Sequence, residues 1–239
     1  MQPLAKSFWD GSGDLGKELL SLVSQRPKYP MTATFVHTPL AQTLLTRPSW
    51  VRDSMLVLGG SLLVAALAQV RIPLPFTPVP ITGQTFGVML VGAGFGSRLG
   101  FLALLLYLLE GLLGLPFFNG GGSGLSHLTG PTGGYLLAFP LAAGLMGWFV
   151  ERWGVDRSPW KMAASILSCS VLIYVLGATW LGVWLNENVG PTSVLAVLTK
   201  GVFPFIPGDL LKCVLAAALL PTTWRWLGRE TADPKSSSS

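Results

Sequence analysis

Charged side chains are scarce in this sequence. Only 11% of its 239 residues are Asp, Glu, Lys or Arg, whereas a soluble domain carries about 25%. Half of the residues are apolar, and the mean hydropathy is +0.56. Because so few charges cannot cover a surface that faces water, we expect an integral membrane protein embedded in a lipid bilayer.

Cysteine and histidine are also rare, with two residues of each. Cys169 and Cys213 lie inside apolar runs, so we interpret them as small buried residues and not as a disulfide pair. Neither has a His or Cys partner at metal-ligand spacing, so we expect no metal site. The net charge of +5 is modest and the basic residues are scattered at helix ends. This pattern excludes a nucleic-acid-binding surface.

Long apolar runs account for most of the chain. A bilayer core about 30 Å thick is crossed by roughly 20 apolar residues, since a helix rises 1.5 Å per residue. We therefore predict an all-α integral membrane protein with six transmembrane helices, at 54–70, 85–96, 98–115, 134–152, 160–185 and 201–220. The predicted domains are an N-terminal extension (1–50), a membrane domain (51–225) and a polar tail (226–239). In the extension, repeated prolines favour disorder over the alternative of a surface helix.

The distribution of Lys and Arg tests this count, because short cytoplasmic loops carry an excess of both. With both termini cytoplasmic, the outer connections hold only Arg71 and Lys200. The inner connections and ends hold Arg47, Arg52, Arg98, Arg152, Arg157, Lys161, Arg225, Arg229 and Lys235. Five or seven helices would break this alternation. The topology also places two loops rich in proline and glycine on the outer face, so a pocket made from them would open outward.

Three ionisable residues lie within apolar segments: Glu110, Asp209 and Lys212. A charge there costs about 2.5–3.5 kcal/mol on insertion scales and usually faces a cavity or another charge. Asp209 and Lys212 are three residues apart, so they share one helix face. Either they form an internal salt bridge, or they present an acceptor and a donor to a polar ligand. We favour the ligand-binding role, because a buried salt bridge often adds little stability. Glu110 either extends outward or approaches the pocket.

The two outer loops have unusual compositions. The 73–80 loop contains four prolines, each of which fixes φ, so it should be a stiff gate or spacer. Thr82 and Gln84 at its end offer hydrogen-bonding groups. The 119–135 loop is rich in glycine, whose backbone N–H groups can bind a carboxylate; the alternative is a flexible linker. We expect the two loops to form the lid and floor of a small-molecule pocket.

The glycine-rich loop does not indicate an enzyme. No Lys follows its glycines, as a Walker A motif requires, so the chain does not hydrolyse nucleotides by itself. Gly121-Gly122-Ser123-Gly124 is similar to the serine motif of rhomboid proteases, which need a histidine from another helix. The histidines here are His127, four residues away, and His37 in the extension.

Small residues recur four apart in the first segment, at Ser61 and Ala65. This spacing allows close approach of another helix. The partner is either a helix of the same bundle or another membrane subunit.

Four motifs, in order, identify a family resemblance: IPLPFTPVPITGQT, LLYLLEGLLGLPFFNGG, GPTGGYLLAFP and FIPGDLLKCVLAA. They resemble the BioY proteins, the biotin-specific substrate-binding (S) components of energy-coupling factor (ECF) transporters. The resemblance covers about residues 54–221. It implies a six-helix S-component fold in the cell membrane that binds biotin from outside. It also implies association with a transmembrane coupling (T) component and ATPases, although some family members work alone.

The resemblance also implies roles for individual residues. The family's ligand contacts correspond to Asn119, Asp209, Lys212, Tyr135, Gln84 and Thr82. Ser61 and Ala65 resemble the surface that docks on the T component. Biotin is expected as transported substrate, with no cofactor. Glu110 departs from the family pattern, in which an apolar residue is expected.

Two other functions stay open at this point. One is an S component or carrier for a different vitamin, and the other is an intramembrane enzyme.

Overall fold

The structure is a computed structural model that describes residues 37, 39–41, 50–216 and 222. Of the predicted N-terminal extension it describes only five residues, and the predicted tail at 226–239 lies outside the described part. Most of the predicted membrane domain can therefore be compared with the observed elements.

The described chain is helical, which confirms the predicted all-α class apart from one short strand pair. A helix coincides with each of the six predicted segments. They are α3 (Trp50–Gln69), α4 (Gln84–Phe95), α5 (Ser97–Leu112), α7 (Gly133–Trp153), α8 (Pro159–Asn188) and the helical stretch Val194–Ala216. That stretch contains α9 (Val194–Gly201), the 3-10 turn η3 (Phe203–Phe205) and a second helical part, 206–216.

Among the described residues, four of these elements are long and apolar enough to cross a membrane: α3, α7, α8 and Val194–Ala216. Helix α4 is apolar but shorter. The sequence placed the start of the last helix at residue 201, whereas the helical stretch begins at Val194. The difference arises because Ser193 caps α9, its hydroxyl accepting a hydrogen bond from Ala196 N, and Pro204 only interrupts the helix.

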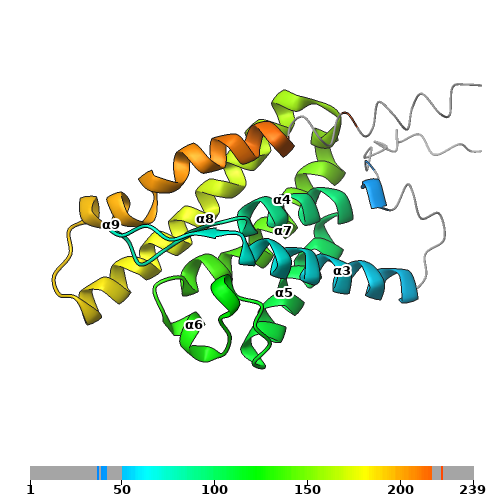
Figure 1. The fold of residues 1–239 in the computed structure, drawn as a ribbon. Coiled ribbons are helices and arrows are strands. Elements are labelled where there is room, and N and C mark those ends of the chain that lie inside the picture. Colours follow the sequence, from blue (N-terminus) through cyan, green and yellow to red (C-terminus); the bar gives the residue numbers. More distant parts are fainter. Residues whose placement is uncertain (1–36, 38, 42–49, 217–221, 223–239) are drawn as a thin grey trace, which may run out of the picture. The chain divides into compact units, whose positions relative to one another are not determined.

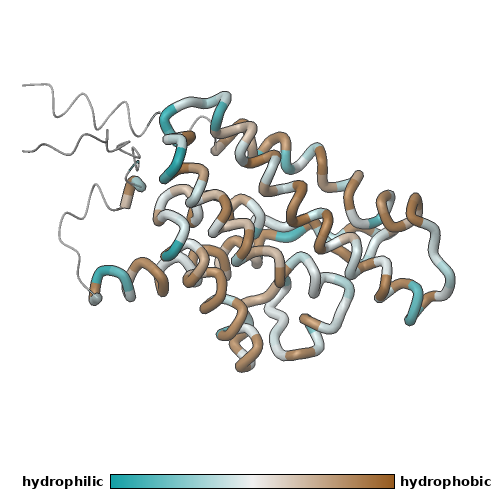
Figure 2. The backbone as a smooth tube through the Cα atoms, turned by 180° about the vertical axis from the view of Figure 1, so that it is seen from behind, coloured by the Kyte–Doolittle hydropathy of each residue, from teal (hydrophilic) through white to brown (hydrophobic). Residues whose placement is uncertain are grey.

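Successive long helices run in opposite directions (Figure 1). One end of the bundle, called here the loop end, carries the connections 70–83, 113–132 and 189–193. The other end, called here the turn end, carries the connections at Gly96 and at 154–158. Figure 2 shows apolar residues along most of the helices and polar residues gathered in connections. This distribution suits helices whose sides face lipid.

Helix α7 lies at the centre of the bundle and packs against α4, α5 and α8. Two thirds of its most apolar window is buried, compared with a third or less for the other long helices. Small residues permit this packing: a Cβ at Gly92 of α4 would lie 2.5 Å from the carbonyl oxygen of Ala143 in α7. The backbones of α4 and α7 therefore touch directly, as small residues allow between membrane helices.

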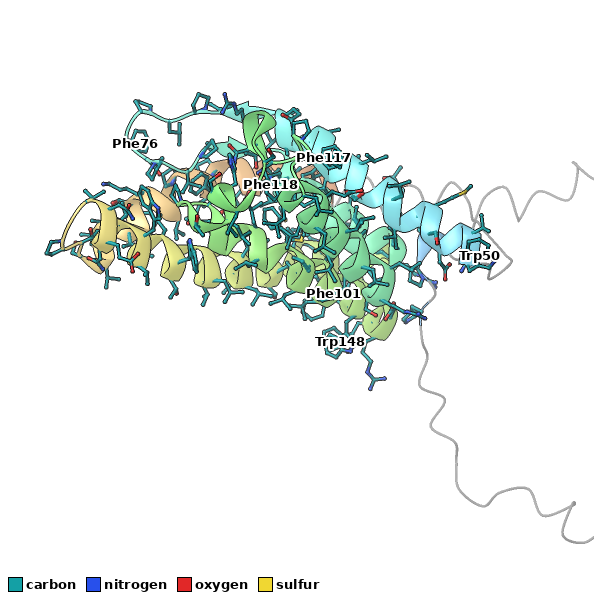
Figure 3. All side chains as sticks on the ribbon, turned by 90° about the horizontal axis from the view of Figure 1, so that it is seen from below. Trp50, Phe76, Phe101, Phe117, Phe118 and Trp148 are labelled. Carbon is teal, nitrogen blue, oxygen red and sulfur yellow. The ribbon has the colours of Figure 1, made fainter. Side chains whose placement is uncertain are left out.

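The loop end contains elements that the sequence did not predict. Strands β1 (Arg71–Ile72) and β2 (Ile81–Thr82) pair antiparallel and close the 73–80 loop into a hairpin. The glycine-rich segment forms a 3-10 turn, η1 (Asn119–Gly121), and a short helix, α6 (Leu125–Thr129). A further 3-10 turn, η2 (Val155–Arg157), lies at the turn end. Figure 3 shows Phe76 at the tip of the hairpin and Phe117 and Phe118 away from that tip, near the end of α3.

Candidate functional site

A cavity lies at the loop end and is lined by α4, α7, α8, helix 206–216 and the two loops. It contains about 520 Å³ of space not occupied by protein atoms, including the part open to solvent. All six residues that the sequence proposed as ligand contacts line it: Thr82, Gln84, Asn119, Tyr135, Asp209 and Lys212. The remaining lining residues are Val79, Pro80, Thr85, Thr132, Leu136, Phe139, Ile173, Tyr174 and Phe205. A wall that combines apolar side chains with convergent polar groups is typical of a small-molecule site.

Asp209 and Lys212 form an ion pair in the wall of this cavity. Lys212 Nζ lies 3.0 Å from Asp209 Oδ1 and donates a 2.8 Å hydrogen bond to Thr85 Oγ1 on α4. The Thr85 hydroxyl lies 3.4 Å from the same carboxylate oxygen and donates to it. The side chains are mostly covered, with 20% of Lys212 and 14% of Asp209 exposed. An ammonium has three donors, so Lys212 keeps one N–H for a ligand.

Tyr174 on α8 completes this cluster by donating a hydrogen bond to Oδ2 of Asp209. Each carboxylate oxygen therefore has a protein donor, and the orientation of the carboxylate is fixed. The sequence analysis missed both Tyr174 and Thr85. The signal for Tyr174 was a tyrosine within a long apolar segment, since a buried tyrosine hydroxyl usually has a partner. Thr85 carried no such signal, because a helical threonine commonly bonds its own helix.

Gln84 begins α4 and is only 4% exposed. Its Nε2 donates to Tyr107 OH on α5 at 2.7 Å, and its Oε1 accepts from Thr82 Oγ1 at 2.8 Å. Tyr107 in turn donates to the carbonyl of Phe117 at 3.2 Å. The Gln84 amide is thereby fixed, and it keeps one N–H and one lone pair for a ligand.

Tyr135 contributes its ring to the cavity. Its hydroxyl is already used, since it donates a 2.7 Å hydrogen bond to the carbonyl of Gly201 in α9. The ring lies against Gly177 of α8, where a Cβ would overlap it. We therefore assign Tyr135 an apolar surface and not a polar contact.

Asn119 is positioned by a loop that Gln69, at the end of α3, holds in place. Gln69 Nε2 lies 3.3 Å from the Phe118 carbonyl and 3.4 Å from that of Pro116, and Oε1 accepts from Gly121 N at 2.9 Å. Gly120 and Gly121 have φ of 69° and 74°, a left-handed conformation that favours glycine. No sequence pattern predicted this role of Gln69.

Several backbone N–H groups of this loop bond within the protein, so fewer of them are available for the anion that the sequence analysis suggested. Gly121 N donates to Gln69, Gly122 N to the Asn119 carbonyl and Gly124 N to the Gly111 carbonyl. The loop is therefore built into the bundle. This organisation also argues against a flexible linker.

The hairpin loop is tied to α9 by one side chain. Thr77 is buried, and its hydroxyl donates to the carbonyl of Lys200 at 2.7 Å and accepts from Val79 N at 3.2 Å. Val79 and Pro80, which follow, line the cavity. The hairpin thus covers one side of the cavity, and among the described residues a single side-chain hydrogen bond, that of Thr77, joins it to α9. This arrangement suits a gate.

The small-residue face of α3 packs inside the bundle. Ser61 is fully buried and Ala65 is 6% exposed, and Ser61 donates to the carbonyl of Leu58. Residues that their own chain covers cannot meet another subunit without rearrangement. In this conformation the face supports the interpretation of internal packing and not that of docking.

Glu110 and Ser123 take no part in the cavity lining. Within the described residues, Glu110 Oε2 is buried without a hydrogen-bond partner. The ring of His127 stacks on Phe118, with ring centres 5.7 Å apart, and within the described part of the chain no hydrogen bond joins it to Ser123. A serine–histidine pair for proteolysis is therefore not formed there. Cys169 and Cys213 are buried and free, as predicted.

Fold and cavity together define a class: a helical, membrane-embedded protein with a small-molecule site at one end of its bundle. The model of the BioY family matches residues 32–229. Among curated relatives, the biotin transporter BioY of Rhodobacter capsulatus is 41% identical, over 71% of this chain and 90% of its own length. The biotin transporter BioY of Rhizobium etli is 34% identical, over 70% of this chain and 90% of its own. The chain belongs to the BioY family, which is a family of transporters and not of enzymes.

A solved structure is similar as well. The S component for biotin from an ECF-type ABC transporter superposes with a TM-score of 0.65 and 27% sequence identity, covering 73% of this chain and 92% of that chain. The resemblance seen in the four sequence motifs is thus confirmed both by relatives and by fold.

Proposed function

We propose that this chain is the biotin-binding S component of an ECF-type transporter and carries biotin across the membrane. The observation that carries the proposal is the cavity, in which the ion pair Asp209–Lys212 and Asn119 line the same space. Membership of a family whose curated relatives are biotin transporters supports it. We expect no cofactor; biotin is the transported substrate.

The chemistry of biotin fits this cavity. Its ureido ring has two N–H donors and one carbonyl, and Asp209 can accept from the ring while Lys212 or Asn119 donates to it. Gln84 and Thr82 add polar contacts. The thiophane ring and aliphatic chain need apolar walls, which Tyr135, Leu136, Phe139, Ile173 and Phe205 supply.

The proposed topology has six membrane crossings and both termini in the cytoplasm, with residues 1–50 and 226–239 outside the membrane domain (51–225). Basic residues support this orientation: Arg98, Arg152, Arg157 and Lys161 lie at or near the turn end, whereas the described connections of the loop end carry Arg71, with Lys200 nearby in α9. The cavity then opens outward from the cytoplasmic membrane, which suits capture of a scarce solute.

A T component and a pair of ATPases are the proposed partners. The solved relative comes from an ECF-type ABC transporter, and this sequence has no nucleotide-binding glycine loop of its own. ATP hydrolysis by separate subunits would supply the energy for uptake.

Biotin uptake tests the proposal directly. The chain is expressed in cells that lack their own biotin importer, with and without coupling subunits, and uptake of labelled biotin is measured. We expect uptake above the vector control, with a further increase when coupling subunits are present. Purified protein should bind labelled biotin, and a panel of unlabelled vitamins should not displace it. Indifference to biotin, or displacement by a different vitamin, would reject the assignment.

A further inference from the structure

The charges in the cavity leave one end of the ligand without a partner. Biotin is an anion at neutral pH, because its carboxyl group has the usual acidity of a carboxylic acid. The two charged residues that line the cavity, Asp209 and Lys212, neutralise one another. The N–H groups of Gly121, Gly122 and Gly124 are used within the protein. A second cation near the cavity would therefore favour binding of the anion.

Arg71 is such a cation, and two independent observations place it beside the cavity. In the β1–β2 pair, Arg71 is directly opposite Thr82, so their side chains lie on the same face of the ribbon. Thr82 lines the cavity. From the other side, the Arg71 guanidinium lies against Gly120, where a Cβ would overlap it. Gly120 is adjacent to Asn119, which also lines the cavity.

The guanidinium of Arg71 is free to bind an anion. Arg71 is exposed, and within the described residues it makes no hydrogen bond or ion pair. A guanidinium presents five N–H donors in a planar fork that matches a carboxylate. A side chain at position 120 would displace the guanidinium, and the left-handed φ of 69° there also favours glycine.

We propose that Arg71 binds the carboxylate of biotin at the mouth of the cavity, while the ureido ring lies deeper, at Asp209 and Lys212. This inference rests on the proposed function and assigns the two ends of the ligand. It makes Arg71 a specificity-determining residue that distinguishes a free acid from a neutral derivative.

A comparison of two ligands tests this assignment. The affinities of full-length protein in detergent for biotin and for biotinamide, whose tail is uncharged, are measured by calorimetry. The variants are Arg71→Gln, Arg71→Lys and, as a matched control, Lys200→Gln, which removes a cation that does not line the cavity. We expect Arg71→Gln to weaken biotin binding about tenfold. This loss is larger than the loss of an exposed ion pair would cause and smaller than that of a desolvated bidentate pair. Biotinamide binding should change less than about twofold, since no charge pair is lost.

The controls have defined outcomes. Arg71→Lys should restore part of the preference for biotin, and Lys200→Gln should leave both affinities unchanged. Equal losses for the two ligands would mean that Arg71 only shapes the loop, and no loss would mean that it contacts solvent or lipid headgroups. Either result overturns the inference, as does a shift of the preference by Lys200→Gln. If the unmodified protein binds neither ligand, the proposed function fails as well.

Discussion

The two ends of the bundle are built differently. At the turn end, Gly96 alone connects α4 to α5, and Glu151 of α7 accepts hydrogen bonds from the backbone and hydroxyl of Ser97 at 2.8 and 2.7 Å. A Cβ at Gly147 would overlap the backbone of this connection. Backbones there are in direct contact, so the turn end has little freedom to move.

At the loop end, long connections are held largely by side chains that bond to backbone groups. The anchors are Gln69 for the Asn119 loop, Thr77 for the hairpin, Tyr135 for α9 and Trp180 for Gly130. A hydrogen bond of this kind contributes only about 0.5–1.5 kcal/mol. The difference suggests that one end stabilises the fold while the other can open and close over a ligand.

The largest effect is expected at the ion pair of the loop end. Removing one member leaves the other charged and mostly covered, which commonly costs 2–5 kcal/mol in binding. Asp209→Asn or Lys212→Met should therefore weaken biotin binding at least about 30-fold, measured by calorimetry in detergent. The variants should still insert and elute as the unmodified protein does. Retention of full affinity in both would contradict the assignment of this wall to the ligand.

The next largest effect is expected on stability, where α4 meets α7. Gly92→Ala would force a methyl group against the backbone of Ala143. Overpacking costs about 1–3 kcal/mol, which corresponds to a melting temperature lower by about 5 °C in a chain of this size. Gly94→Ala on the same helix is the matched control, because nothing lies within 4 Å of its added Cβ. Biotin affinity should not change in either variant, and equal melting temperatures would show that the packing there is not tight.

A smaller effect is expected at an anchor of the loop end. Gln69→Ala removes the side chain that bonds to Phe118 and Gly121, so Asn119 loses its fixed position. Biotin binding should weaken about tenfold, mainly through faster dissociation, with little change in melting temperature. Asn188→Ala is the control, since among the described residues that amide bonds only to the carbonyl of Trp184 in its own helix. If the dissociation rate equals that of the control, Gln69 does not position the binding site.

The smallest effect is expected at the corresponding contact of the turn end. Glu151→Gln keeps one acceptor for Ser97 but loses the negative charge at the start of α5. Such a charge contributes about 0.3–1 kcal/mol, so the melting temperature should fall by only about 2 °C. Biotin affinity should be unchanged. A loss of affinity without a loss of stability would contradict the idea that the turn end stabilises the fold while the loop end binds the ligand.

How far the site could be predicted depends on whether its contacts are local. Asp209 and Lys212 were recognised because a spacing of three residues puts them on one helix face whatever the surroundings. Thr82, Gln84, Asn119 and Tyr135 were proposed from family resemblance, and they do line one cavity. The hydrogen-bond partners were not foreseen: Tyr107 for Gln84, Thr85 for Lys212 and Tyr174 for Asp209, from three different helices. The packing of such helices decides those contacts.

The sequence also did not determine which part of the protein buries the small residues of α3. The spacing of Ser61 and Ala65 showed that a helix could approach closely, but not which helix. In the structure, α3 packs on α4 and α5, and the face is covered by the chain itself. The β1–β2 pair was also missed, because two residues are too few to form a recognisable alternating pattern.

The sequence by itself determined the class of the protein and the approximate positions of its apolar helices, because apolar runs of this length and a shortage of charge leave little besides a helical bundle in lipid. It also determined that an acid and a base share a helix face. Only the tertiary structure decided which groups complete their hydrogen bonds, that Gln69 fixes the Asn119 loop and that Arg71 lies against Gly120. These contacts join residues far apart in the chain, so they depend on how helices pack and not on any local pattern.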